Sequence, residues 1–136
     1  MPDFRKVTDA FFVSPQISEA DIDAAAEAGV KTIISNRPDG EAGPFQPKED
    51  QLRARAEGLG LAFVSIPFQG FPSEDVVARM GDTLAQADAP ILAFCRSGTR
   101  SITAWALAQH GAHDEKSVIA LAAEAGYDLS GLRGRL

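Results

Sequence analysis

The sequence contains a single cysteine, Cys95, and only two histidines among its 136 residues. One cysteine excludes an internal disulfide framework and a zinc site built from several thiolates. We find no set of metal ligands and expect no metal and no cofactor. Basic residues are in the minority, with 13 Lys and Arg against 19 Asp and Glu, which gives a formal charge of −6. Because nucleic-acid-binding surfaces are normally basic, we expect no nucleic-acid partner.

Long apolar runs are missing as well. No stretch approaches the roughly 20 residues needed to cross a bilayer, so we expect no membrane contact. The N-terminal residues 1–6 lack the apolar core of a signal peptide. These absences favour a cytoplasmic protein, in which Cys95 stays a reduced thiol. The length and the apolar fraction of 45% predict one globular domain over residues 1–136. Nothing in the sequence indicates the oligomeric state.

Short apolar stretches alternate with helical patterns along the chain. Strands are expected at 11–13, 31–35, 61–66 and 91–94. Helices are expected at 18–29, at 48–59, after Ser73, at 99–110 and at 115–125. This alternation predicts an α/β fold with a mostly parallel sheet. Ligands of such sheets bind beyond the carboxyl ends of the strands, where three candidate site loops follow, at 36–41, 67–72 and 95–100.

The segment from Cys95 to Ser101, called the cysteine loop below, carries the clearest chemical signal. An apolar strand leads into a Gly-containing loop and then directly into a helical pattern. Unpaired backbone N–H groups and the positive end of the helix dipole meet at such a junction and favour an anion. A thiolate is an anion, so we expect the pKa of Cys95 to lie below the roughly 8.5 of a free thiol.

The neighbours of Cys95 strengthen this interpretation. Arg100 supplies a planar fork suited to a tetrahedral oxyanion. The Ser101 hydroxyl is placed to donate a hydrogen bond to the sulfur. A lone cysteine after a strand is more often a small core residue, but a core residue does not require so many polar neighbours. The loop therefore predicts a nucleophilic Cys95 that faces a small anionic substrate. The expected oxyanion-binding residues are Arg96, Ser97, Gly98 and Thr99.

Several other side chains have two interpretations each. Arg37 is expected either to contact the anion or to be a solvated turn residue, and Asn36 precedes it in the same loop. Arg96 either widens the positive field or bonds to an acidic neighbour such as Asp39 or Glu41. His110 and His113 follow the helix that begins at the cysteine loop, which places them away from the site. Trp105 is expected to anchor that helix to the sheet.

Several segments resemble the phosphatase-like domain of beta-lactamase hydrolase-like proteins, a bacterial family related to dual-specificity phosphatases. The matching segments are 4–6, 14–16, 29–31, 36–41 and 94–101, and the last is the most specific. The resemblance covers nearly the whole chain up to the second-last helix. It implies a cysteine-phosphatase-like fold, with a four- or five-stranded sheet flanked by helices. It also implies that Cys95 is the nucleophile and that Arg100 holds the oxyanion.

The spacing between the cysteine and the arginine of this loop differs from that of cysteine phosphatases. Cysteine phosphatases place five residues between cysteine and arginine, whereas four separate Cys95 from Arg100. The shorter ring offers one N–H fewer to the equatorial oxygens. The four-residue spacing and the letters Cys-Arg-Ser-Gly are similar to rhodanese-type sulfurtransferases, whose cysteine carries a persulfide.

A second departure concerns the general acid. A phosphomonoester's leaving alkoxide needs a proton, and related phosphatases supply it from an Asp shortly after a strand-ending Ile-Pro. Gln69 stands at the matching place. Asp75 lies further on, where a helix-capping role explains it better. Asp39 is the other candidate, although turn formation explains it equally well. Sulfur transfer needs no such acid.

Three functional hypotheses follow from these residues. The first is a cysteine-dependent phosphatase-like hydrolase acting on a phosphoester. The second is a rhodanese-like sulfurtransferase that carries sulfane sulfur as a Cys95 persulfide. The third is a module that binds an oxyanion without turnover. The physiological substrate and any partner enzyme are not indicated by the sequence.

Overall fold

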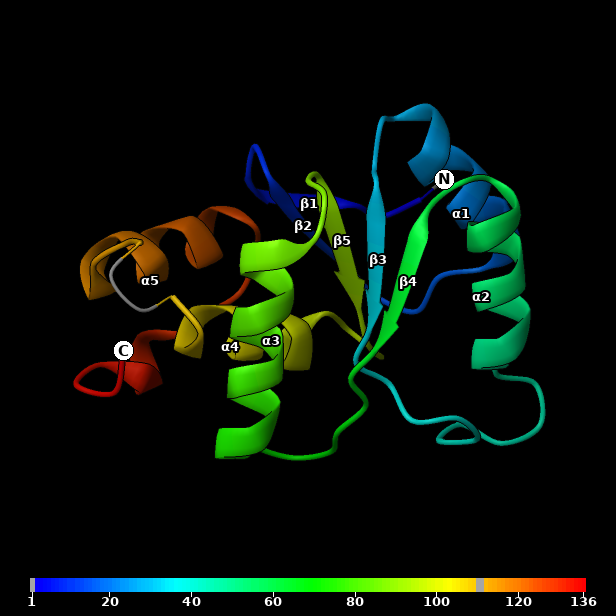
Figure 1. The fold of residues 1–136 in the computed structure, drawn as a ribbon. Coiled ribbons are helices and arrows are strands. Elements are labelled where there is room, and N and C mark those ends of the chain that lie inside the picture. Colours follow the sequence, from blue (N-terminus) through cyan, green and yellow to red (C-terminus); the bar gives the residue numbers. More distant parts are fainter. Residues whose placement is uncertain (1, 110–111) are drawn as a thin grey trace.

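A computed structural model describes residues 2–109 and 112–136 and shows a five-stranded sheet between two helical layers (Figure 1). The strands are β1 (Arg5–Thr8), β2 (Phe11–Ser14), β3 (Thr32–Ser35), β4 (Ala62–Ser65) and β5 (Ile91–Phe94). Their order is β1-β2-β5-β3-β4, and only β1 runs antiparallel to its neighbour. The predicted α/β fold with a mostly parallel sheet is confirmed. The sequence analysis missed β1, a four-residue edge strand with a single buried residue, Val7.

The helices are α1 (Glu19–Glu27), α2 (Glu49–Gly58), α3 (Glu74–Gln86), α4 (Thr99–Leu107) and α5 (Glu115–Glu124), followed by a 3₁₀ turn at Ser130–Leu132. Ser18 caps α1 as predicted, in a capping box with Asp21. Ser73 caps α3 through the N–H of Val76. The predicted extension of α4 to His110 was too long, since the helix ends at Leu107, and His110 lies outside the described residues.

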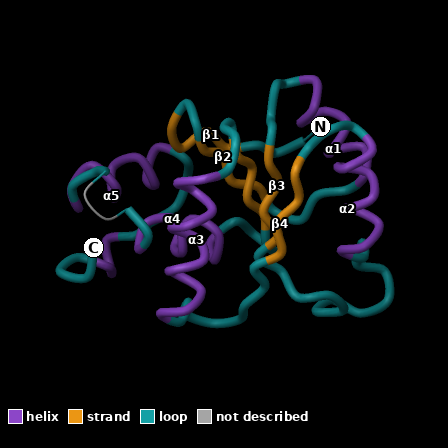
Figure 2. The backbone as a smooth tube through the Cα atoms, in the orientation of Figure 1, coloured by secondary structure: helices purple, strands orange, loops and turns teal. Residues whose placement is uncertain are grey.

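The sheet separates two hydrophobic cores because successive strand residues face opposite sides. Ile33 and Leu92 pack with α1 and α2, whereas Ile34 and Ala93 pack with the helices of the other face. Figure 2 shows the two groups of helices on either side of the strands. Trp105 of α4 is buried and stacks on Phe11 of β2, with 5.5 Å between ring centroids, so its predicted anchoring role is confirmed.

The four parallel strands end at one level of the sheet. Ser35 pairs with both Ser65 and Phe94, and Phe94 pairs with Ser14. The loops after β3, β4 and β5 therefore leave the sheet at the same edge. In the described part of the chain, no helix is both long and apolar enough to cross a membrane.

Candidate active site

Cys95 lies directly after β5, where its N–H extends the sheet ladder to the carbonyl of Ser14 at 3.4 Å. The residue is completely buried. The chain then turns through Gly98, whose φ of 95° is open to glycine, and α4 begins at Thr99. The N–H of Gly98 donates to the Cys95 sulfur at 3.1 Å. The sulfur thus sits at a helix N-terminus and accepts one backbone N–H, a position that favours an anion.

Arg96, Ser97 and Thr99 of the cysteine loop are exposed, whereas Gly98 is buried. Ser97 and Thr99 bond to each other through their hydroxyls at 3.1 Å. The backbone carbonyl of Arg96 accepts from the N–H of Gln16 at 3.3 Å. In the described ranges the Arg96 guanidinium has no ion pair, so the suggested bond to Asp39 or Glu41 is wrong.

The predicted hydrogen bond from the Ser101 hydroxyl to the Cys95 sulfur is wrong. This hydroxyl is buried in the first turn of α4 and has no hydrogen-bond partner within the described structure. The expected bond from Ser101 to Cys95 is therefore not formed. The backbone N–H of Gly98 approaches the sulfur instead, because the four-residue loop turns this peptide back toward Cys95.

Arg100 is held by a carboxylate that the sequence analysis did not place in the site. Its Nη1 donates to Glu41 Oε2 at 2.8 Å, and its Nη2 donates to Glu41 Oε1 at 2.6 Å. Nη1 also donates to the carbonyl of Phe68 at 2.9 Å. Glu41 follows β3 and Phe68 follows β4, so the predicted meeting of the three loops is confirmed. The signal for Glu41 was its position in the 36–41 loop.

Glu41 collects two further donors. Arg37 Nε lies 2.9 Å from Oε1, and Gln69 Nε2 lies 3.1 Å from Oε2. Arg100, with help from Arg37 and Gln69, lowers the pKa of Glu41 to about 2, against the opposing effect of burial. The same ion pair, together with the charge of Cys95, raises the pKa of Arg100. Glu41 is therefore an ionised acceptor at neutral pH and has no proton to donate.

Arg37 is buried, with 7% of its surface exposed, so it is not a solvated turn residue. Besides Glu41, its Nη1 donates to Gln16 Oε1 at 3.1 Å. Gln16 belongs to the loop between β2 and α1. Arg37 therefore joins a fourth loop to the charged group around Arg100.

Asn36 lies beneath the site and joins the strand ends. Its Nδ2 donates to the carbonyl of Ile66 at 2.9 Å, and its backbone N–H donates to the carbonyl of Phe94 at the same distance. The backbone carbonyl of Asn36 accepts from the N–H of Phe68 at 3.3 Å. Asn36 therefore holds the loops after β3 and β4 against the end of β5.

The two aspartates considered as general acids have other positions. Asp39 Oδ1 accepts from the N–H of Glu49 at 2.8 Å, so Asp39 caps α2 from a preceding loop. Asp75 is exposed in the first turn of α3, where its charge favours the helix dipole. Neither hydrogen-bonds to the cysteine loop in the part of the chain described. Gln69, at the place where an acid was expected, donates to Glu41.

The C-terminal region also reaches the cysteine loop. Tyr127 follows α5, is buried, and donates its hydroxyl to the carbonyl of Ser97 at 2.8 Å. No sequence signal marked this residue. It is an isolated aromatic beyond the segments that carry the family resemblance.

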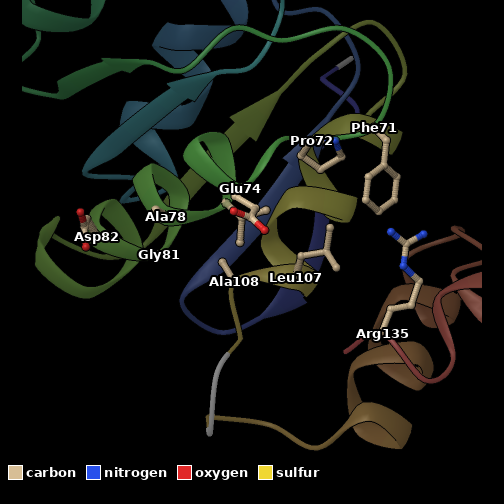
Figure 3. A pocket seen from close by; sticks show the side chains of 10 residues that line it. Phe71, Pro72, Glu74, Ala78, Gly81, Asp82, Leu107, Ala108 and Arg135 are labelled. Carbon is tan, nitrogen blue, oxygen red and sulfur yellow. The ribbon is translucent and has the colours of Figure 1, made fainter.

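A separate hollow opens between α3, the end of α4 and the C-terminal tail (Figure 3). Phe71 and Arg135 lie at one end, with the guanidinium 4.4 Å from the ring centroid. None of the lining residues belongs to the cysteine loop. Phe71 lies three residues after Phe68, so this hollow starts beside a loop of the site.

Comparison with known families finds a match to a phosphatase-like domain. Residues 3–112 match the model for the phosphatase-like domain of beta-lactamase hydrolase-like protein. The beta-lactamase hydrolase-like protein of Agrobacterium fabrum is 30% identical over 105 residues, which are 76% of this chain and 24% of that protein. The Xylella fastidiosa protein of the same name is 35% identical over 107 residues, with 76% and 25% covered. The chain thus spans about a quarter of the length of these curated relatives.

Solved structures with similar folds are phosphatases or candidate phosphatases. A candidate phosphatase from Neisseria meningitidis superimposes with a TM-score of 0.85 at 32% identity, covering 99% of this chain and 96% of the other. TpbA of P. aeruginosa, solved in complex with pTyr, has a TM-score of 0.65 at 18% identity, covering 96% and 88%. The second comparison supports the fold alone.

Proposed function

We propose that this chain, which belongs to the phosphatase-like domain family of beta-lactamase hydrolase-like proteins, hydrolyses phosphomonoesters through the Cys95 thiolate. Membership of this family supports a phosphatase-like hydrolase. The nucleophile and the substrate class are the parts that we propose.

One observation carries the proposal: the Cys95 sulfur accepts the N–H of Gly98 at the start of α4, beside the guanidinium of Arg100. Backbone N–H groups at a helix N-terminus stabilise a thiolate and the oxygens of a phosphoryl group in the same place. A guanidinium has five N–H donors, of which Glu41 and Phe68 occupy three. Among the contacts of the described residues, two donors remain for an oxyanion.

The reaction proceeds in two steps in this proposal. The Cys95 thiolate attacks phosphorus, so that an S–P bond forms and the ester P–O bond breaks with its electrons on the leaving oxygen. Water then attacks the thiophosphate, which breaks the S–P bond, regenerates the thiolate and releases inorganic phosphate. In both steps Arg100 and the loop N–H groups hold the three non-bridging oxygens.

The ionised state of Glu41 narrows the substrate class. No described hydrogen bond places a protonated carboxylate beside the cysteine loop, and Glu41 is held as an anion. The leaving oxygen must then depart without a protein acid. Aryl or acyl phosphates, whose leaving groups are weak bases, are therefore better substrates in this proposal than alkyl phosphates.

The lack of a protonated carboxylate beside the cysteine loop in the described structure also favours a second candidate function. Transfer of sulfane sulfur through a Cys95 persulfide needs no general acid. The four-residue loop also suits a transferred sulfur atom, which is smaller than a phosphoryl group. In that reaction the thiolate attacks the outer sulfur of thiosulfate, an S–S bond forms, and sulfite leaves. A cyanide or thiol acceptor then takes the outer sulfur and releases the thiolate.

Parallel assays separate the two reactions. Intact-protein mass is measured after brief exposure to thiosulfate, and turnover of a chromogenic aryl phosphate is measured beside it, each with wild type and Cys95→Ser. Aryl phosphate turnover that is lost in Cys95→Ser, without a sulfur adduct, supports the phosphatase. A sulfur-mass adduct on Cys95 that cyanide removes supports sulfur transfer. Aryl phosphate turnover that survives in Cys95→Ser contradicts the first proposal, and a sulfur adduct that survives in Cys95→Ser contradicts the second.

A further inference from the structure

Tyr127 contacts the cysteine loop from a part of the chain that the family model does not cover, since the match ends at residue 112. After α5 the chain turns at Gly126, with a φ of 97°, and brings Tyr127 into the core beside the loop. Its hydroxyl donates to the carbonyl of Ser97 at 2.8 Å. This is a contact between residues 30 positions apart.

The Ser97 carbonyl bonded to Tyr127 belongs to the same peptide group whose N–H donates to the Cys95 sulfur. The Ser97–Gly98 peptide has its C=O on Tyr127 and its N–H on the Cys95 sulfur, at 2.8 and 3.1 Å. The C=O and N–H of a trans peptide point in opposite directions, so the hydroxyl and the sulfur lie on opposite sides of it. Hydrogen bonds in such a chain polarise one another, which makes the N–H a stronger donor.

This peptide needs an external support because Gly98 does not restrain it. Glycine tolerates both signs of φ, so rotation of the Ser97–Gly98 peptide costs little locally. The rotated peptide would turn the Ser97 carbonyl oxygen toward the sulfur, where it repels a thiolate and any bound oxyanion. A methyl group at Gly98 would overlap the Tyr127 hydroxyl, so the close approach also requires glycine at this position.

The surroundings of Tyr127 keep it a donor. Arg5 of β1 lies over its ring, 5.1 Å from the centroid, and pairs with Asp3. Burial raises the pKa of the phenol above its usual value near 10, and the charge of Cys95 acts in the same direction, while Arg5 opposes both. The phenol is therefore protonated at neutral pH. The charged groups on the other side of the loop are Arg100 and its partner Glu41.

We propose that Tyr127 is a positioning residue, which holds the Ser97–Gly98 peptide so that its N–H points at the Cys95 sulfur. The effect on turnover rests on the proposed function of Cys95, whereas the effect on the sulfur itself does not. Residues beyond the matched family segment thereby complete the cysteine loop.

The test is the rate at which iodoacetamide alkylates Cys95 as a function of pH. Tyr127→Phe keeps the ring and removes the hydroxyl. We expect its alkylation profile to move to higher pH, with a rate at pH 7 about fivefold below wild type, because the sulfur loses a polarised donor. The control is Thr32→Val, which removes a hydroxyl bonded to the carbonyl of Asp88, outside the cysteine loop. Its profile should match wild type.

A second probe uses the fact that Tyr127 is the chain's only tyrosine. Growth on 3-fluorotyrosine labels this position alone and makes the phenol a stronger donor without changing its packing. We expect the alkylation profile between pH 5 and 8 to move to lower pH, opposite to Tyr127→Phe. This probe also serves if Tyr127→Phe does not fold.

The outcomes separate this inference from the proposed function. Unchanged alkylation profiles in Tyr127→Phe or in the fluorinated protein overturn the role of Tyr127, whatever the catalytic activity. Shifts in opposite directions support it, even if Cys95→Ser retains turnover and the proposed function fails.

Discussion

The two ends of the cysteine loop are held by different kinds of group. At the Cys95 end the supporting donors are neutral groups, the Gly98 N–H on the sulfur and the Tyr127 hydroxyl on the Ser97 carbonyl. At the Arg100 end they are ionic, through the carboxylate of Glu41. Neutral dipoles respond little to salt and to moderate changes of pH, whereas an ion pair depends on both. The nucleophile and its oxyanion partner are thus held by different groups, although the charge of Cys95 also raises the pKa of Arg100.

Replacement of Arg100 by Lys is the strongest way to break the ionic end. A lysine cannot hold Glu41 and an oxyanion with a planar fork, so we expect kcat/KM for an aryl phosphate to fall about 100-fold, and phosphate inhibition to weaken. Alkylation of Cys95 should change much less, because the Gly98 N–H remains. Arg79→Lys, on the exposed face of α3, is the matched control. Unchanged phosphate inhibition in Arg100→Lys would contradict the oxyanion role.

Glu41→Gln tests the charge at the same end through stability. The pKa of Glu41 is lowered in the folded state, so its ionised form stabilises the fold above its ordinary pKa of 4.5, and this contribution is lost as pH falls toward 2. We expect Glu41→Gln to lower the free energy of unfolding by about 2 kcal/mol at pH 7. The difference from wild type should shrink between about pH 4.5 and pH 2.

Urea unfolding at a series of pH values measures this difference. Asp23→Asn, which breaks an exposed pair with Arg55, is the matched control and should have a smaller effect. A stability difference for Glu41→Gln that is constant from pH 7 to pH 2 would show that its charge is not responsible.

Asp39→Ala separates a structural carboxylate from a catalytic one. Loss of the cap on α2 should lower the free energy of unfolding by about 1 kcal/mol. Turnover of an aryl phosphate should fall less than about threefold, and Asp75→Asn should behave alike, because general acids contribute about 100-fold or more. A fall of that size in either variant would identify it as the acid.

Ser101→Ala should have the smallest effect of the series. Its hydroxyl is buried and has no hydrogen-bond partner among the described residues, so its removal leaves none of them unsatisfied. We expect the free energy of unfolding to change by less than about 0.5 kcal/mol and the alkylation profile of Cys95 to stay in place. A shift of that profile to higher pH would show that Ser101 does bond to the sulfur in solution.

The fold was predictable wherever the signal is local. β2, β3, β4 and β5 are apolar stretches next to turn residues, and Ser18 and Ser73 mark the starts of α1 and α3. β1 was not predictable, because only Val7 of its four residues is buried and its place depends on pairing with β2. Short edge strands owe their structure to a neighbour more than to their own pattern.

The candidate site was predictable in its location but not in its contacts. The prediction that the loops after β3, β4 and β5 lie together at one edge of the sheet was correct. Arg100 donates hydrogen bonds to Glu41 after β3 and to Phe68 after β4. The predicted bond from Ser101 to the sulfur was wrong, and of the two interpretations of Arg37 its burial excludes the solvated turn residue. Such contacts depend on the rotation of each side chain about its element, which residue spacing does not determine.

By itself the sequence determined that a strand, the cysteine loop and α4 follow one another around Cys95, because each of these features depends on neighbouring residues. Only the tertiary structure decided which carboxylate holds Arg100 and which hydroxyl holds Ser97. Glu41 lies 59 positions from Arg100, and Tyr127 lies 30 positions from Ser97. Contacts over such separations form only when the packed sheet and helices bring the segments together, and no local pattern records them.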